Sequence, residues 1–324
     1  MIDIKKVTMY YGPVKAVDSV SFEARQGEVL GLLGPNGAGK TTTMNVIAGH
    51  LVPQSGTVAV GGHDVVENPV EARRLTGYLP EREPLYPEME VAEYLRFVGR
   101  ARGLGGARLK ERMEWVVEAC ALAPVYRKLL CDLSRGYRQR AGLAQALIHD
   151  PPVLILDELT SGLDPLQTSE VRKLVRNLAH GAGQEKCIVF STHVMQEAQA
   201  VSDRVVIINN GQIVAQGGVE EIRMQACREV SALVTVEAPP EEARTAFVAV
   251  RGVAGVEVQA CAAGEASLRV RCSGQGHLLK EIAQAARSRG WLVKELSPVK
   301  PSLEEAFLAL VSTHERARAE EVRP

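Results

Sequence analysis

A glycine-rich stretch near the start of the chain constrains its fold more than any other feature. Residues 34–41 read Gly-Pro-Asn-Gly-Ala-Gly-Lys-Thr. The apolar run at 29–33 has the length and character of a buried parallel strand, and residues 41–47 can continue as a helix. The glycines between them let the backbone turn tightly, so that its N–H groups point inward at the helix N-terminus, where the dipole favours a polyphosphate. This strand–loop–helix unit, a P-loop, predicts binding of a nucleoside triphosphate.

The side chains of this loop have separate expected tasks. Lys40 would reach the β- and γ-phosphates, and the Thr41 hydroxyl would be a ligand of Mg²⁺. A glycine-rich turn with a chance lysine is the structural alternative, but it leaves the flanking strand and helix unexplained. The residues predicted to contact the nucleotide are Gly34, Pro35, Asn36, Gly37, Ala38, Gly39, Lys40, Thr41 and Thr42.

A second apolar run ends in two carboxylates. Residues 153–156 read Val-Leu-Ile-Leu, and Asp157 and Glu158 follow directly. A second buried strand would deliver both acids to the edge of the sheet that carries the P-loop. Asp157 would hold the Mg²⁺ shell, and Glu158 would polarise the attacking water. Two adjacent acids alone could simply begin a solvated loop, but beside a P-loop they predict hydrolysis of the triphosphate.

Composition narrows the class of protein. A chain of 324 residues suggests about two domains, and 38 Lys+Arg against 39 Asp+Glu give a net charge of −1, which argues against a general nucleic-acid binder. No apolar run approaches the ~20 residues needed to span a bilayer, and no signal segment is recognisable. The six cysteines are scattered without a Cys-x-x-Cys pair, which favours reduced, mostly buried thiols over a disulfide frame or a zinc site. We therefore expect a soluble, cytoplasmic protein.

Short apolar strands alternate with helical stretches over residues 1–220, which is typical of an α/β domain with a largely parallel sheet. Residues 84–150 lack convincing strands and have helical spacing, so they are expected to form an inserted helical subdomain. Pro151 and Pro152 would enforce the end of its last helix. The Asn210-Gly211 pair predicts a hairpin turn near the end of the domain.

A different pattern begins after residue 220. We expect a linker at 221–230 and a small α+β domain at 231–311, in which the element order β-α-β-β-α-β suggests a ferredoxin-like fold. Helices are expected at 240–250 and 277–289, and a last strand at 291–294. Ser302 and Glu305 predict a capping box that starts a further helix, and residues 312–324 are expected to form a frayed tail.

Residues 133–140, which read Leu-Ser-Arg-Gly-Tyr-Arg-Gln-Arg, resemble the signature motif of ATP-binding-cassette (ABC) ATPases. Further motifs follow the order of that family over residues 1–220. Tyr11 looks like the aromatic residue that stacks on adenine, and Glu81 occupies the glutamine-loop position. Residues 161–164, ending in Asp164, look like the D-loop, and His193 looks like the switch histidine. The resemblance implies a RecA-like P-loop NTPase fold of the ABC type.

The resemblance also implies how such a chain works. Two cassettes pack head to tail, and each ATP with its Mg²⁺ lies between the P-loop of one copy and Ser134 and Gly136 of the other, at a helix N-terminus. Asp164 would also cross this interface. His193 would hydrogen-bond the γ-phosphate and help to hold Glu158. The implied partners are a second cassette, most simply a copy of the same chain, and a transmembrane permease on the inner face of the plasma membrane.

Four positions depart from the family pattern. Glu81 replaces the commoner glutamine; a carboxylate can still reach Mg²⁺ through water, but it brings a negative charge. Arg135 and Tyr137 replace a glycine and a glutamine in the signature. Leu159 stands where a proline usually follows the catalytic glutamate, so the fixed backbone angle of that turn is lost.

Two classes of function fit these motifs. The chain resembles bacterial exporter subunits of the multidrug and gliding-motility type, with an importer as the second choice within transport. The alternative is a soluble cassette ATPase that acts on nucleic acid or ribosomes, which usually carries two cassettes or a long coiled coil. One cassette and a slightly acidic net charge favour transport.

A group of basic residues in the helical subdomain forms either a solvated face or a contact with anionic lipid; these are Arg96, Arg100, Arg102, Arg108, Lys110 and Arg112.

Overall fold

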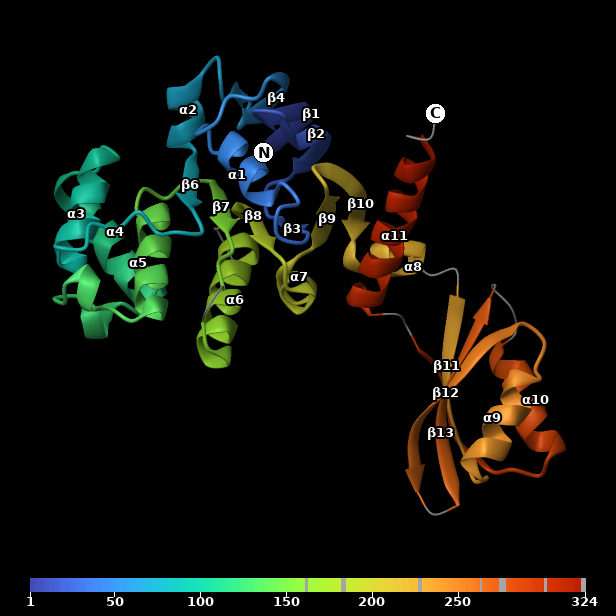
Figure 1. Cartoon of the computed structure of the whole chain (residues 1–324). Coiled ribbons are helices and arrows are strands. Elements are labelled where there is room, and N and C mark those ends of the chain that lie inside the picture. Colours follow the sequence, from blue (N-terminus) through green and yellow to red (C-terminus); the bar gives the residue numbers. More distant parts are fainter. Residues whose placement is uncertain are drawn as a thin grey trace. The chain divides into compact units, whose positions relative to one another are not determined.

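The computed structural model describes residues 1–160, 163–181, 185–226, 229–262, 264–273, 278–299 and 302–321. The chain forms two compact units, Met1–Val219 and Glu220–Pro324 (Figure 1). Each unit encloses its own hydrophobic core.

A six-stranded sheet lies at the centre of the first unit, in the order β10-β9-β3-β8-β7-β6. All neighbours pair in parallel except β9 and β10. The strands β3, β7 and β8 are buried along their whole length, which explains why the sequence shows them as continuous apolar runs. The bounds are β3 Val29–Leu33, β6 Thr76–Leu79, β7 Val153–Asp157, β8 Cys187–Thr192, β9 Arg204–Asn209 and β10 Gln212–Gly218.

The two faces of this sheet belong to different cores. Along β7, Leu154 and Leu156 belong to one core cluster, while Val153 and Ile155 belong to the other. This follows from the alternation of side chains along a strand. The first cluster also takes in apolar residues of the helical subdomain and of α6 (Pro165–His180), and the second those of α1 (Lys40–Ile47).

A second, antiparallel sheet in this unit was not anticipated. Its order is β2-β1-β4-β5, with bounds β1 Ile2–Tyr11, β2 Val14–Ala24, β4 Ser55–Val60 and β5 His63–Asp64. This region was expected to belong to one largely parallel sheet. The strand β1 pairs with β4 in addition to its sequence neighbour β2, and such non-local pairing leaves no local mark in the sequence. The short helix α2 (Pro69–Arg74) follows β5.

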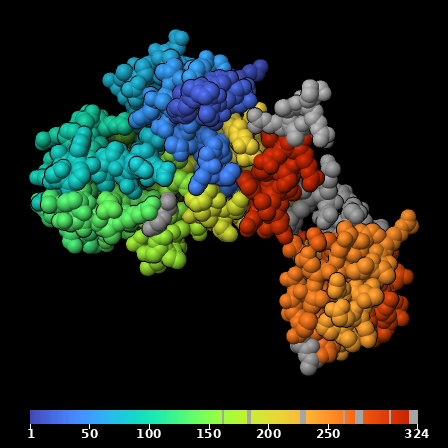
Figure 2. Space-filling view, viewed as in Figure 1, coloured from blue at the N-terminus to red at the C-terminus, as the bar shows by residue number. Residues whose placement is uncertain are grey.

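The stretch predicted to be a helical insertion contains α3 (Val91–Ala101), α4 (Gly106–Ala119) and α5 (Arg135–Leu147). Glu90 and Glu93 form a capping box at the start of α3. In Figure 2 these helices, coloured from turquoise to green, form one lobe of the unit. The chain then returns to the sheet through Pro151 and Pro152, as expected. The predicted hairpin is also present, since Asn210 (φ 48°) and Gly211 (φ 78°) join β9 to β10 in the left-handed region that such a turn requires.

The second unit has the predicted element order β-α-β-β-α-β, with strands in the order β12-β13-β11-β14. Its core is formed by apolar residues of both helices and the sheet, among them Phe247, Leu268 and Ile282. The ferredoxin-like assignment itself stays a prediction. The bounds are β11 Glu229–Val236, α9 Pro240–Val248, β12 Val253–Ala262, β13 Glu265–Ser273, α10 Leu278–Ser288, β14 Val293–Val299 and α11 Leu303–Glu321.

Several expectations for this region were wrong. Residues 221–230 are not a plain linker, because α8 runs over Val219–Ala226 and β11 begins at Glu229. Residues 312–321 are helical rather than frayed: the predicted capping box starts α11, and the alanines, glutamates and arginines that follow are good helix formers. Trp291 precedes its strand instead of beginning it. His277 and residues 322–324 lie outside the described residues.

The described cysteines are less buried than expected. Cys120 and Cys187 are buried free thiols, but Cys131 and Cys261 are exposed.

No helix in the described part of the chain has both the length and the apolar character needed to cross a membrane.

Candidate functional site

The predicted P-loop, metal-binding and catalytic residues meet at the carboxyl ends of four neighbouring strands. In the sheet, β3 pairs with β8, β8 with β7, and β7 with β6, all in parallel. The P-loop comes directly after β3, and His193 comes directly after β8. Glu158 is the first residue after β7, and Glu81 lies two residues after the end of β6. In sheets of this kind, ligands bind in the crevice outside the carboxyl ends of the strands.

Two glycines of the P-loop are required by close packing. A Cβ atom on Gly34 would lie 2.3 Å from the carbonyl oxygen of Ile208 in β9. Gly39, which caps α1, has φ +104°, and a Cβ there would lie 2.4 Å from the carbonyl oxygen of Ala16. Any side chain at either position would push the loop away from the sheet. The tight approach of the loop therefore depends on neighbours that are remote in the sequence.

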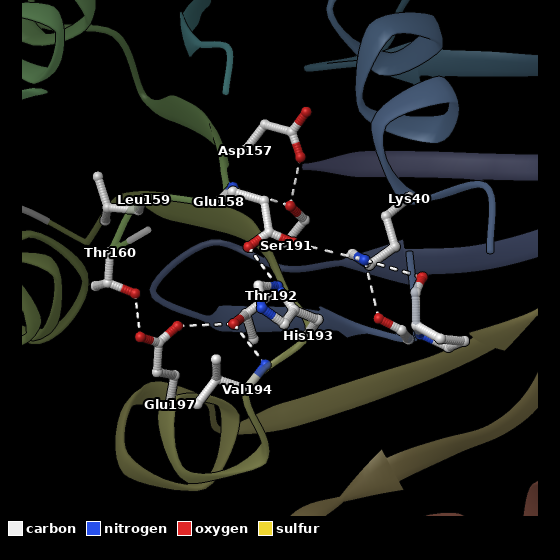
Figure 3. A network of polar contacts seen from close by, with 12 residues as sticks. Lys40, Asp157, Glu158, Leu159, Thr160, Ser191, Thr192, His193, Val194 and Glu197 are labelled. Atoms are coloured by element: carbon white, nitrogen blue, oxygen red, sulfur yellow. Dashed lines mark hydrogen bonds and ion pairs between the residues drawn. The ribbon is translucent and has the colours of Figure 1, made fainter. Parts of the chain in front are cut away.

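Lys40 folds back over the loop that it follows (Figure 3). Its Nζ donates to the carbonyl oxygens of Gly34 (2.9 Å) and Pro35 (3.2 Å), and it lies 3.5 Å from Oε1 of Glu158. The residue is only 6 % exposed. This ammonium group is thus held at the centre of the P-loop, where an incoming phosphate would offer stronger, charge-assisted acceptors than carbonyl groups.

Asp157 has the features of a metal-binding carboxylate. It is 1 % exposed; Oδ1 accepts a hydrogen bond from the Ser191 hydroxyl, whereas Oδ2 has no hydrogen-bond partner among the described residues. Burial raises the pKa of Asp157, and the charges of Glu158 and Glu81 add to the rise, while the hydroxyls of Ser191 and Thr41 oppose it. A buried oxygen without a partner, next to the Thr41 hydroxyl, matches the hard oxygen ligands that Mg²⁺ prefers.

Glu158 adopts a left-handed backbone conformation (φ 51°), which is unfavourable for a residue with a side chain. Two contacts hold it there. Its N–H donates to Oγ of Ser191 (3.0 Å), and its carbonyl accepts from Nε2 of Gln139 (3.3 Å). Gln139 also donates to the carbonyl of Leu159, so the turn is supported although the family's proline is absent.

The Glu158 carboxylate lies between two cationic or potentially cationic groups. Oε2 lies 2.9 Å from Nδ1 of His193, and Oε1 faces Lys40. The Glu158 side chain is 10 % exposed, whereas that of His193 is 45 % exposed. The histidine therefore contacts the carboxylate with one ring nitrogen while much of its ring remains open to solvent, where a ligand could reach it.

The signature residues lie elsewhere in the same unit. Ser134 caps α5 and accepts from the N–H of Tyr137, and a Cβ on Gly136 would lie 2.4 Å from Oε1 of Gln167. Asp164 caps α6 and accepts from the N–H of Gln167 (2.8 Å). Among the described residues, neither Ser134 nor Gly136 hydrogen-bonds to the P-loop. Ser161 and Gly162 of the predicted D-loop lie outside the described residues.

Two other predicted positions are open to solvent. Tyr11, at the end of β1, is 50 % exposed. Glu81 is exposed but close enough to raise the pKa of Asp157.

Two of the six basic residues in the helical subdomain hydrogen-bond to the backbone rather than only facing solvent or lipid. Arg102 donates to the carbonyl of Arg73, and Arg112 donates to those of Leu147 and Ile148.

Sequence reasoning missed the residues that support these side chains. Ser191 holds both Asp157 and Glu158, and Gln139 holds the turn after them. Thr192 and Glu197 extend the network beyond His193. The run Ser191-Thr192-His193 places hydroxyls beside the histidine, but nothing local in the sequence tells which distant group they contact.

Comparison with known proteins agrees with this geometry. A family model described as ABC transporter matches residues 17–161. An uncharacterised ABC transporter ATP-binding protein of Bacillus subtilis, YxlF, is 40 % identical over 73 % of this chain and 77 % of its own length. The daunorubicin resistance ATP-binding protein DrrA3 of Streptomyces coeruleorubidus is 32 % identical, with 95 % of both chains covered.

The chain belongs to the ATP-binding subunits of ABC transporters. A solved structure of the ATP-binding subunit of an ABC transporter, 30 % identical, has a TM-score of 0.64 over 69 % of this chain and 92 % of its own. The α/β P-loop fold with its helical subdomain is therefore that of an ABC cassette. As a member of this family, the protein binds ATP, hydrolyses it and works with transmembrane partners.

Proposed function

We propose that this subunit dimerises around two ATP molecules to drive export through a separate transmembrane permease. The observation that carries the proposal is the similarity to a drug-resistance ATP-binding protein, because it extends over 95 % of both chains and so includes the second unit as well as the cassette. Transport is favoured over action on nucleic acid or ribosomes for the same reason.

In the proposed reaction, Glu158 polarises the water that attacks the γ-phosphate. Its carboxylate is fixed by the Ser191 and Gln139 contacts to its backbone and by His193 and Lys40 on either side. Lys40 and the P-loop backbone would hold the phosphates, and His193 would touch the γ-phosphate through its exposed side. Tyr11 would stack on the adenine ring.

Mg²⁺ would be held by Thr41 and Asp157, with Glu81 reaching it through water. The unpaired Oδ2 of Asp157 and the nearby Thr41 hydroxyl support this assignment. When bound, the ion would neutralise charge on the phosphates. The function of Asp157 and Thr41 is to hold oxygen ligands in place for it.

Dimerisation would complete each site. Among the described residues, Ser134 and Gly136 make no hydrogen bond to the P-loop of their own chain. Ser134 is exposed at the N-terminus of α5, a position that favours an anion. In a head-to-tail homodimer, these residues of one copy would face the γ-phosphate held by the other. ATP would then stabilise the interface, and hydrolysis would release it, a two-state change that a permease could convert into motion.

A pull-down from detergent-solubilised native membranes tests the transport proposal. The bait is the Glu158→Gln protein with ATP and Mg²⁺, which should hold the dimer closed, and the control bait is Lys40→Ala, which should bind nucleotide poorly. Recovery of a multi-spanning membrane protein with the first bait supports the proposal, and the identity of that protein would begin to define the cargo. Recovery of ribosomal or nucleic-acid-binding proteins without any membrane protein would overturn it.

A further inference from the structure

The ends of β7 and β8 carry Glu158 and His193, and one buried carboxylate joins the two chain segments just beyond them. Glu197, in α7 (Met195–Val201), accepts a hydrogen bond from the Thr160 hydroxyl at Oε1 and from the Thr192 hydroxyl at Oε2, the latter over 2.7 Å. Thr160 lies two residues after Glu158, and Thr192 lies directly before His193. Figure 3 shows Glu197 beneath both segments.

The direction of these bonds is fixed by the neighbouring groups. The Thr192 hydroxyl accepts from the N–H of Val194 (3.0 Å), so its single hydrogen is free to point at Glu197. Each carboxylate oxygen therefore has its own hydroxyl donor. The nearest cationic nitrogen is on Arg172, at 3.8 Å from Oε1, which is too long for a direct hydrogen bond.

The surroundings leave little room for water to replace these donors. Glu197 is 9 % exposed, and with Leu159 and Phe190 it lines a cavity of about 10 Å³. This volume is at or below what one water molecule needs. A buried carboxylate without hydrogen-bond donors is strongly unfavourable, so Thr160 and Thr192 must stay in place as long as Glu197 does.

We propose that Glu197 is a positioning residue for hydrolysis, which acts by holding the Glu158 and His193 segments at a fixed separation. In this role it would contact neither the nucleotide nor the attacking water. Its effect runs through the 2.9 Å contact between Nδ1 of His193 and Oε2 of Glu158. This inference rests on the proposed roles of those two residues.

The test is the ATPase rate of the Glu197→Gln protein. Glutamine keeps the size of the side chain, and its oxygen can accept from one threonine hydroxyl. Its NH₂ group can only donate, so the second hydroxyl must turn its hydrogen away and be met at its oxygen. We expect kcat to fall about tenfold and KM for ATP to change by less than about twofold, because displacement of catalytic groups by a fraction of an ångström is costly to rate. Thr160→Val should lower kcat in the same way, and Thr160→Ser, which keeps the hydroxyl, should restore it.

Glu28→Gln is the matched control. Glu28 is 7 % exposed and also joins two segments, since it accepts from the N–H of Arg25 and from the guanidinium of Arg204. It precedes β3 at the opposite end of the strands, away from the P-loop. If loss of a buried carboxylate merely weakens the fold, both variants will lower the melting temperature and kcat alike. Positioning by Glu197 predicts that only Glu197→Gln lowers kcat.

The double variant Glu197→Gln, His193→Ala separates positioning from a general defect. Because Glu197 acts through His193 and Glu158, its removal should cost less than about twofold in kcat once His193 is absent. A full tenfold loss in that background, or an unchanged kcat in Glu197→Gln alone, would overturn the inference. Glu158→Gln is measured in the same assay. If its ATPase rate equals that of the wild type, both the catalytic assignment of Glu158 and this inference are wrong. A large loss in Glu158→Gln together with an unchanged rate in Glu197→Gln rejects this inference alone.

Discussion

The Asp157 carboxylate is buried at the end of β7 beside the Glu158 charge, and its Oδ2 has no hydrogen-bond partner in the part of the chain that the structure describes. Its pKa is raised by burial, so the folded state binds this proton more tightly than the unfolded chain does. The stabilisation from this group is present below the unfolded pKa of about 3.9 and is lost as pH rises through the folded pKa. At neutral pH the nucleotide-free fold therefore carries an unfavourable buried charge.

Asp157→Asn should relieve that charge and abolish metal-dependent hydrolysis at the same time. We expect the free energy of unfolding of the nucleotide-free protein at pH 7 to rise by about 1 kcal/mol, because the neutral amide removes the buried charge while a buried polar atom stays unpaired. Thermal unfolding in the presence of a chelator measures this, and an ATPase assay measures the loss. A lower melting temperature in the variant would mean that the carboxylate is already satisfied without metal.

Lys40 and Glu158 lie 3.5 Å apart, yet their removal should have different consequences. Glu158→Gln should keep ATP binding and lose roughly 10²–10⁴-fold in hydrolysis, because only activation of the water is removed. Lys40→Ala should weaken binding itself, because the central cation of the P-loop is lost. Titration with labelled ATP, paired with turnover measurements, distinguishes the two; unchanged affinity in Lys40→Ala would contradict the assignment.

The site residues that could be predicted are those that follow a buried strand or form a local motif. The P-loop, Asp157, Glu158 and His193 each stand next to an apolar run, and the sheet brings such strand ends together. Gln139 and Glu197 could not be predicted, because each acts on a backbone or hydroxyl group that only tertiary packing brings within reach. Their own sequence neighbourhoods are those of ordinary helix residues.

At the scale of secondary-structure elements, His149 joins the end of the helical subdomain to the central sheet. Its Nε2 lies 3.1 Å from the carbonyl oxygen of Thr76 at the start of β6, and its buried Nδ1 has no partner among the described residues. Burial lowers the pKa of His149 to about 4, and the charges of Arg102 and Arg112 act in the same direction. The unfolded histidine, with a pKa near 6.5, binds its proton first.

The stabilisation linked to this depressed pKa is complete above about pH 6.5 and is lost as pH falls toward 4. Between pH 7 and pH 5 the first unit should therefore lose about 2 kcal/mol through this residue. His149→Gln, which does not titrate, should be less stable at pH 7 but show a pH dependence reduced by that amount. Urea denaturation of both proteins at the two pH values provides the comparison, and parallel losses in both would exclude His149 as the source.

Elements buried on both faces were easier to predict than elements with one exposed face. The strands β3, β7 and β8 appear as unbroken apolar runs, whereas β1 and β2 mix buried with exposed residues, and β1 also pairs with β4 over a long sequence distance. The linker and tail were misjudged for a related reason. Charged, alanine-rich stretches such as that of α11 read equally well as solvated coil or as a helix, and local pattern alone does not decide between them.

At the scale of the whole molecule, the two units have separate cores and each contains one of the two tryptophans. Trp115 lies in α4 with the Arg112 guanidinium over its ring, and Trp291 packs edge-on against Phe247, with ring centroids 6.1 Å apart. Because the described core clusters do not cross the boundary after Val219, we expect two separable unfolding transitions.

Phe247→Ala should lower the midpoint of the unfolding transition of the second unit and leave that of the first unit unchanged. Phe247 is fully buried, so its removal leaves a cavity that costs about 3–5 kcal/mol. In a Trp115→Phe background, the remaining fluorescence of Trp291 reports that transition, while the ATPase rate reports the first unit. We expect the fluorescence midpoint to fall and the kcat of the isolated subunit to stay within about twofold, since no predicted site residue lies in the second unit. A parallel fall in both would mean that the cassette depends on the second unit for its own stability.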